Sequence, residues 1–157
     1  MNDLKQQAID LGLCTPYQSE WKDDDNLVER YINGYAWCLA KQFPSLEDML
    51  PYKEELEENN VFNSKQDIDF LLTAETYILN ECTGKVEIND WNVSSLYIAR
   101  NSVIEADIKD NSILTIETYD TTNLRLKIAK DSKCTIWLYG NSCVQILSGD
   151  ATIIDKR

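Results

Sequence analysis

Histidine is absent from the 157 residues, which excludes a Ser-His-Asp triad, a Cys-His dyad and any imidazole metal ligand. Glycine and proline are scarce, at five and three residues, and no glycine-rich phosphate loop is present. The longest uninterrupted apolar stretch, from Tyr35 to Ala40, is far too short to cross a bilayer. The N-terminus lacks the basic and apolar segments of a signal peptide. These absences predict a cytoplasmic protein that is not an enzyme and holds no cofactor.

Disulfide and zinc patterns are missing as well. The cysteines are odd in number and none has a C-x-x-C spacing, so we expect neither a closed disulfide framework nor a zinc site. Reduced thiols in the cytoplasm fit this pattern best. The five residues are Cys14, Cys38, Cys82, Cys134 and Cys143.

Basic residues are few: 15 Lys and Arg stand against 27 Asp and Glu, which gives a net charge of −12. Such a surface repels phosphate backbones, so we expect no direct binding of nucleic acid. Most of the excess acid lies in residues 1–70, which carry 6 basic and 15 acidic side chains. This acid either forms a solvated helical surface or makes the protein an acidic nucleic-acid mimic that fills the basic cleft of another protein.

The N-terminal part has the pattern of helices. Apolar residues from Leu27 to Leu39 recur at steps of three and four. Good N-cap residues at 23–26 precede them and Pro44 follows, so the pattern predicts one amphipathic helix.

A capping box at Ser45 predicts a further helix that is either kinked or restarted at Pro51. Glutamates crowd its end, where their charges oppose the helix dipole. They form a candidate acidic surface for a partner: Glu54, Glu55, Glu57 and Glu58. We expect a helical subdomain over residues 1–62.

A ten-residue repeat fills residues 71–150. When this segment is divided into eight consecutive tens, the sixth position is apolar in seven repeats and the eighth position in six. Apolar positions two residues apart indicate a strand with one buried face. Turn residues recur between these strands, as in Asp110-Asn111-Ser112 and Gly140-Asn141-Ser142. The pattern therefore predicts short strands with a turn every ten residues.

Alternate repeats differ on their outward-facing positions. Odd repeats carry residues such as Ser95 and Tyr97, whereas even repeats carry charges such as Lys85 and Glu87. A twenty-residue superperiod favours a β-solenoid of about four coils, in which every twentieth side chain from Leu71 onward lies over its predecessor. An antiparallel meander or β-sandwich is the alternative. The fold class is α+β, with a β-repeat subdomain over 71–157 packed against the helices.

Outward positions of the odd repeats collect aromatic residues into a predicted strip: Tyr77, Tyr97, Tyr119, Trp137 and Tyr139. Either the N-terminal helices cover this strip, or it is an exposed surface for a glycan or a protein partner. The ends of a coil expose unpaired backbone groups. Either residues 151–157 and the helices cap the coil, or it stacks on another copy.

Several short motifs are similar to those of a known group of proteins. They are Leu11-Gly12-Leu13-Cys14 followed by Trp21, Tyr31-Ile32-x-Gly34, Phe43-Pro44-Ser45, Asn60-Val61-Phe62 and Leu96-Tyr97-Ile98-Ala99-Arg100. With them the chain resembles a group of short proteins of gut Bacteroidetes and their phages that has no assigned activity. The tail also resembles polymer-forming β-helix repeats. The resemblance implies a helical part followed by a β-helix-like tail, adds a virion as a possible location, and transfers no functional residue.

These features predict a non-enzymatic structural or protein-interaction module that binds a partner protein or itself, and that is either self-assembling or phage-associated. The alternatives are an acidic nucleic-acid mimic and a glycan-binding β-solenoid. We expect no catalytic residue, no metal ligand and no membrane partner.

Overall fold

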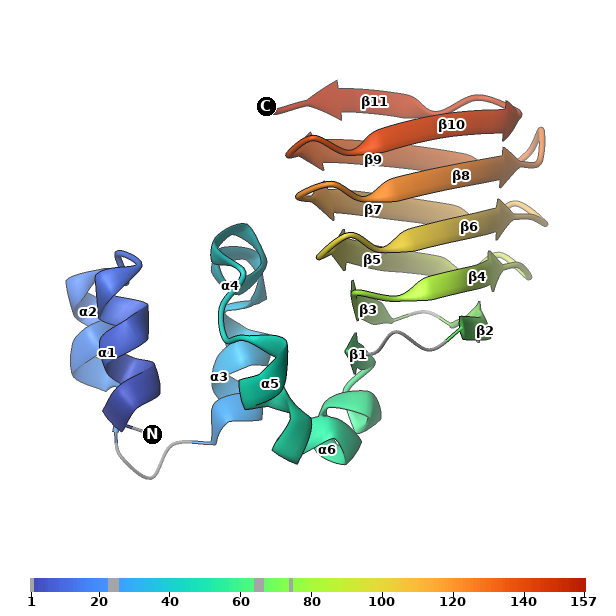
Figure 1. Cartoon of the computed structure of the whole chain (residues 1–157). Helices are drawn as coiled ribbons and strands as arrows, with labels where there is room; N and C mark the ends of the chain where they lie inside the picture. The colour runs from blue at the N-terminus through green and yellow to red at the C-terminus, as the bar shows by residue number, and fades with distance from the viewer. Residues whose placement is uncertain (1, 23–25, 64–66, 74) are drawn as a thin grey trace. The chain divides into compact units, whose positions relative to one another are not determined.

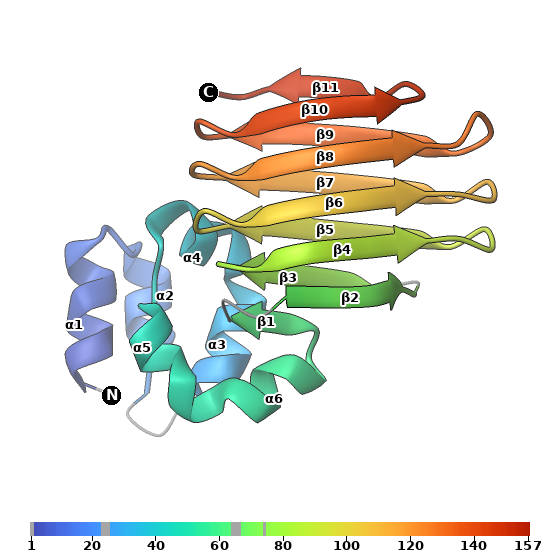
Figure 2. The same ribbon diagram turned by 45° about the vertical axis from the view of Figure 1, so that its right-hand side comes forward.

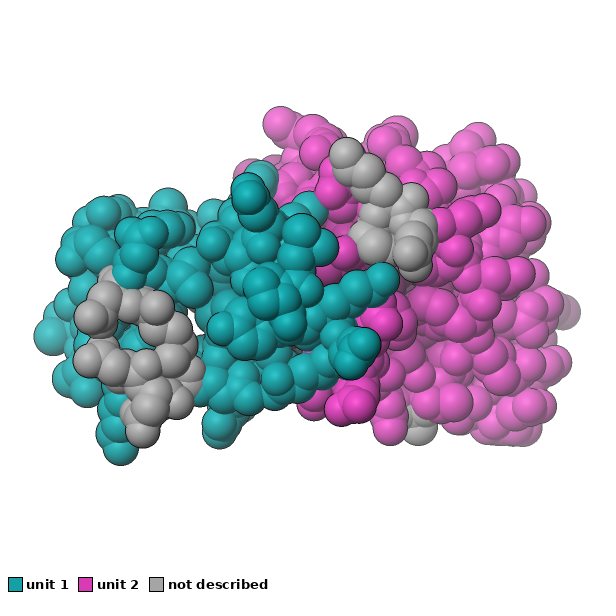
Figure 3. Space-filling model, turned by 60° about the horizontal axis from the view of Figure 1, so that its bottom comes forward, with its two compact units in different colours: residues 1–55 teal, residues 56–157 magenta. Residues whose placement is uncertain are grey.

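The computed structural model describes residues 2–22, 26–63, 67–73 and 75–157. The chain divides into two compact units, residues 1–55 and residues 56–157 (Figure 3). The first unit is helical, and nearly all of the second is a parallel β-solenoid. The predicted α+β class with a C-terminal solenoid is thus confirmed.

Short helices build the N-terminal part (Figure 1). Side-chain caps open two of them. Asn26 accepts a hydrogen bond from the Val28 backbone nitrogen at 2.8 Å, and Ser45 accepts one from the Asp48 nitrogen at 3.1 Å. The rest of the predicted cap, Asp23–Asp25, lies outside the described residues. The helices are α1 (Asn2–Asp10), α2 (Thr15–Glu20), α3 (Leu27–Asn33), α4 (Tyr35–Lys41), α5 (Leu46–Met49), the 3-10 turn η1 (Leu50–Tyr52) and α6 (Lys53–Glu58).

The predicted single helix over residues 27–39 is instead two helices, α3 and α4, that meet at Gly34. The Gly34 nitrogen donates to the carbonyl oxygens of Arg30 and Tyr31 at 3.1 and 3.2 Å. A Cβ at this position would lie 3.3 Å from the Arg30 carbonyl oxygen, so the close approach favours glycine. Most of the apolar stripe is nevertheless buried as the spacing predicts, while Ile32 and Tyr35 are partly buried.

Parallel strands alternate between two sheets of the solenoid (Figure 2). Sheet A has the order β1-β3-β5-β7-β9-β11 and sheet B the order β10-β8-β6-β4-β2. The strands are β1 (Val61–Asn63), β2 (Asp67–Leu72), β3 (Thr76–Asn80), β4 (Thr83–Ile88), β5 (Val93–Ala99), β6 (Val103–Ile108), β7 (Ile113–Tyr119), β8 (Asn123–Ile128), β9 (Lys133–Tyr139), β10 (Cys143–Ser148) and β11 (Thr152–Asp155). The coil has about five turns rather than four, because strands before residue 71 and after residue 150 also take part.

The twenty-residue register holds through the middle of the solenoid. Val103 lies beside Asn123, and Ile113 lies beside Lys133. The register changes at both ends: Ile78 lies beside Tyr97, one residue short of the repeat, and Thr135 lies beside Thr152. The prediction that every twentieth side chain from Leu71 stacks on its predecessor is therefore wrong for the first and last rungs.

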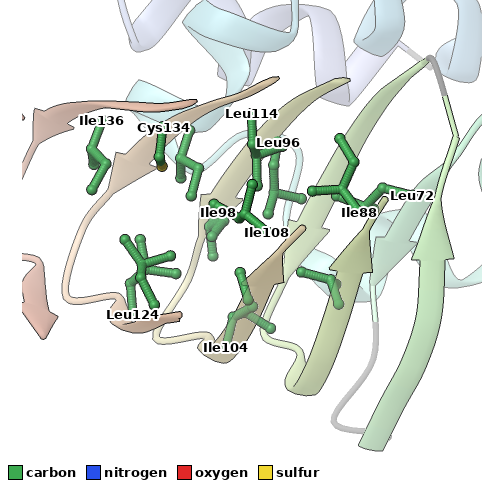
Figure 4. Close-up of a cluster of buried hydrophobic side chains, with 14 of the residues drawn as sticks. Leu72, Ile88, Leu96, Ile98, Ile104, Ile108, Leu114, Leu124, Cys134 and Ile136 are labelled. Carbon is green, nitrogen blue, oxygen red and sulfur yellow. The ribbon is translucent and has the colours of Figure 1, made fainter. Parts of the chain in front are cut away.

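Inward-facing side chains of both sheets form one continuous core (Figure 4). Leu96, Ile116 and Ile136 are each 0% exposed and follow one another at the twenty-residue spacing. Tight corners join the strands, and pairs of residues there adopt left-handed backbone angles, as at Asp110 (φ 51°) and Asn111 (φ 59°). Asp and Asn tolerate this conformation better than other residues with a side chain, which explains their recurrence between the strands.

Candidate functional site

The predicted aromatic strip does not form one surface. Tyr77 lies beside Leu96 and is only 6% exposed, so it belongs to the core and not to the outer face. Its hydroxyl oxygen accepts a hydrogen bond from the Thr73 nitrogen at 3.1 Å. The cause is the register between β3 and β5. One residue fewer than twenty reverses the face to which each β3 side chain points.

The other four aromatic residues form two groups on sheet A, and Glu117 contacts both. Tyr97 and Trp137 stand on one outward ladder, with Glu117 between them. The Lys156 ammonium lies 5.4 Å from the centre of the Trp137 ring. A carboxylate and an ammonium therefore interrupt the flat aromatic path that a sugar chain would follow.

Tyr119 and Tyr139 form the second group, with ring centres 5.3 Å apart and nearly parallel planes. Tyr119 is 5% exposed, and its hydroxyl donates to the Glu117 carboxylate at 2.8 Å. Burial, followed by the Glu117 carboxylate, raises the pKa of Tyr119 above its ordinary value. Tyr119 thus acts as a packing residue, and only Tyr139 of this pair is well exposed.

Charges on one outward ladder of sheet B alternate in sign, whereas the neighbouring ladder places Glu87 beside Asp107. Asp69, Lys85, Glu105 and Arg125 follow one another on successive strands. The Lys127 ammonium lies 2.7 Å from Glu105, and that hydrogen bond is the main reason that the pKa of the Glu105 carboxyl is lowered. This face is a network of ion pairs and not the uniform acidic surface that a nucleic-acid mimic would present.

The glutamates of the candidate acidic surface lie on α6. Glu54 and Glu58 are exposed, while Glu55 and Glu57 are partly buried. The Glu55 carboxylate accepts a hydrogen bond from the Asn26 side chain at 2.5 Å, which joins α6 to the cap of α3. The cluster therefore has a structural contact within the helical unit in addition to its exposed charges.

Sequence reasoning missed the most exposed aromatic residue of the solenoid. Trp91 stands at the corner between β4 and β5, is 74% exposed and has a left-handed backbone (φ 63°). Val93 and Ile113 lie beside each other on the adjoining rungs and are 57% and 38% exposed. We call these three residues the corner patch. A signal was present: most other repeats have Asn, Asp or Thr where Trp91 stands.

The part of the chain that the structure describes offers few groups suited to metal binding or covalent chemistry. No cluster of three or more potential metal ligands occurs among these residues. None of the described helices combines the length and apolar character needed to cross a bilayer. The five cysteines, all of them among the described residues, form no disulfide. Burial raises the pKa of Cys134 to about 12, which makes this thiol unreactive at neutral pH.

Comparisons with known protein families, curated proteins and solved structures gave no match. The surfaces described above are therefore the basis for the functional proposal.

Proposed function

We propose that the protein is a non-catalytic interaction module, in which the solenoid is a rigid support that presents the corner patch to a partner protein. The observation that carries this proposal is Trp91, a large aromatic side chain that is 74% exposed in a backbone conformation unfavourable to it. Tryptophan is among the residue types most enriched at the energetic centres of protein interfaces.

Trp91 is unfavourable for folding in two respects. A left-handed backbone costs a residue with a side chain roughly 1–2 kcal/mol, and Asn or Gly at this position would reduce that cost. The exposed ring also leaves most of its apolar surface in water, which gains nothing until a partner covers it. Local deviations of this kind concentrate at functional sites, so they support a binding role.

Hydrogen bonds hold the backbone of this corner, so the Trp91 ring can contact a partner without a change in the backbone. The Trp91 nitrogen donates to the Asp110 carbonyl oxygen at 3.0 Å, which ties this corner to the next one. The Asn92 side chain donates to the Asn89 carbonyl oxygen at 2.8 Å and closes the turn. A side chain on such a fixed turn loses little backbone entropy when it binds.

Charged residues surround the apolar centre of the patch. Asp90 is exposed at this corner and Asp110 at the next corner, and exposed Lys133 follows Ile113 on the ladder. An apolar centre with a polar rim is the usual anatomy of a protein interface. The charged rim also fits a partner that binds reversibly rather than one that folds together with this chain.

The test compares three forms of the tagged full-length chain as bait in a lysate of cells that naturally produce it: wild type, Trp91→Asn and Val103→Thr. Val103 is a matched control, because it is 43% exposed at the start of β6, on sheet B. We expect a partner that wild type and the Val103 variant retain and that the Trp91 variant loses. That partner, once purified, should bind in the same order. Equal retention by all three baits would contradict the proposal, and so would the recovery of no specific protein.

A further inference from the structure

The helical unit contains a cavity that the proposed interaction does not use. Its volume is about 460 Å³, within the range of about 300–1,000 Å³ found for small-molecule sites. Every lining residue that the structure describes falls between Gly12 and Pro44, within the first unit. They come from α2, α3 and α4, from the connections that precede each of these helices, and from the segment after α4.

Aromatic rings form much of the cavity wall. Phe43 lies between two tryptophans, with its ring centre 6.3 Å from that of Trp21 and 5.7 Å from that of Trp37, both in edge-to-face arrangements. Tyr31 is a third buried ring beside Trp21 and Phe43, while Trp37 is partly buried and Tyr17, which also lines the cavity, is 56% exposed. The buried rings pack on one another, which indicates a preformed site.

Charge at the cavity favours a positively charged ligand. Among the described lining residues Arg30 is the one basic side chain, and it is already engaged: its guanidinium lies 5.7 Å from the centre of the Trp21 ring and donates to the Glu20 carbonyl oxygen. Two exposed carboxylates, Glu20 and Glu29, also line the cavity. Residues 1–55 as a whole carry 11 acidic and 5 basic side chains, so the surrounding field is negative as well.

We propose that this cavity binds a small organic cation, an ammonium compound with an apolar or aromatic body. The faces of aromatic rings attract cations, and Arg30 over Trp21 is an example within the cavity itself. The apolar body would displace water from between the rings, while the ammonium group would lie near Glu20 and Glu29. An anionic ligand would meet the same two carboxylates with unfavourable charge, which the single guanidinium of Arg30 offsets only in part.

Tryptophan fluorescence can test this proposal directly. The full-length chain with Trp91→Phe and Trp137→Phe retains two of its four tryptophans, Trp21 and Trp37, and both line the cavity. Titrations would use benzyltrimethylammonium, the neutral benzyl alcohol and the anionic 3-phenylpropanoate at low salt. We expect saturable quenching by the ammonium compound at a Kd roughly fivefold or more below that of the alcohol, and the weakest binding for the anion.

The charge requirement has its own control. Glu20→Gln with Glu29→Gln should bring the Kd of the ammonium compound to that of the alcohol. Glu47→Gln, an exposed carboxylate on α5 that does not line the cavity, should leave it unchanged. Calorimetry with the unsubstituted chain gives the same ranking of probes without any variant. Equal Kd values for the three probes, tighter binding of the anion, or no saturable binding would each overturn the proposal.

Discussion

Ser102 and Ser112 occupy equivalent corner positions in successive repeats, yet their hydroxyl groups differ in what they bind. The Ser102 hydroxyl accepts a hydrogen bond from the Cys82 nitrogen at 3.0 Å and donates to the Ala99 carbonyl oxygen at 2.6 Å. The Ser112 hydroxyl is buried and has no hydrogen-bond partner among the described residues. One hydroxyl therefore connects two rungs, while the other only fills space.

This difference predicts opposite effects of the same substitution. Ser102→Ala leaves the buried Cys82 nitrogen without an acceptor and should lower the free energy of unfolding by about 1–3 kcal/mol. Ser112→Ala removes a buried polar group that has no partner, so its stability should stay equal or rise. Urea unfolding of both variants measures the two changes. Equal losses would contradict the hydrogen bonds assigned to this corner.

The backbone conformation of Trp91 gives a second prediction at this scale. Trp91→Asn should raise the free energy of unfolding by about 1 kcal/mol, because Asn tolerates the left-handed region better and little buried surface is lost. Trp91→Val should lower it, since a β-branched side chain fits this conformation worst. A loss of stability in the Asn variant, again measured in urea, would mean that Trp91 has a structural role.

Residue patterns predicted the core far better than they predicted the exposed aromatic residues. The inward positions of the middle repeats follow from alternation alone, because each strand there keeps the same register. The prediction placed Tyr77 on the wrong face of the sheet. One corner is a residue shorter than the others, which turns every β3 side chain to the opposite face, and the sequence of β3 itself does not show this shift. Trp91 is not predicted as a site, because the repeat pattern assigns its position to a turn and not to a strand.

At the scale of elements, sheet B depends on charge pairs between neighbouring strands. The pKa of the Glu105 carboxyl lies below its ordinary 4.5, first through the hydrogen bond from Lys127. A lowered pKa in the folded state stabilises the fold above the ordinary value, and this contribution is lost as the pH falls through the folded value.

Lys127→Met should therefore raise the Glu105 titration midpoint toward 4.5 in a carboxyl NMR titration. The loss of stability between about pH 5 and pH 3 should also become less steep. Lys130→Met provides the control, because Lys130 is exposed at a corner and does not contribute to the Glu105 shift. An unchanged Glu105 midpoint in the Lys127 variant would show that the pair does not form in solution.

The last rung of the solenoid combines an apolar residue with two features that oppose the pairing of a further strand. Ile153 lies beside the core residue Ile136 and is 47% exposed, so an apolar end is available for stacking. Asp155, however, lies beside the core residue Leu138, and Arg157 holds the pKa of its carboxyl at about 2. A charge at an inward position and the register irregularity between Ile146 and Ser148 in β10 both protect a sheet edge from further pairing.

We therefore expect the wild-type chain to remain monomeric over a concentration series in light scattering. Asp155→Leu should associate in a concentration-dependent manner, because it extends the apolar end and removes the charge. Asp150→Leu, a nearby exposed aspartate outside the strands, serves as the control. Association of the wild type, or none in the Asp155 variant, would contradict this role of Asp155.

Helices were harder to predict than strands. A stripe of apolar residues fixed the buried face of residues 27–39, but the break at Gly34 depends on hydrogen bonds to two carbonyl groups that the spacing does not reveal. The cavity of the helical unit was not predicted at all. Its walls come from separate segments of residues 12–44, and only their packing brings Trp21, Trp37 and Phe43 together.

At the scale of the whole molecule, the order of the solenoid strands determines where the residues of the corner patch lie. Each strand pairs in parallel with the strand two positions along the chain, so odd and even strands form separate sheets. That order brings Val93 beside Ile113 and sets Trp91 at a corner next to them. An antiparallel meander would pair successive strands instead and would remove the patch.

Nuclear Overhauser contacts between backbone protons of the labelled full-length chain test this order most directly. We predict contacts of the parallel type between strands twenty residues apart, such as Glu105 with Arg125 and Ile113 with Lys133. Backbone contacts between the successive strands β6 and β7, in the antiparallel pattern, would contradict the solenoid and the corner patch with it.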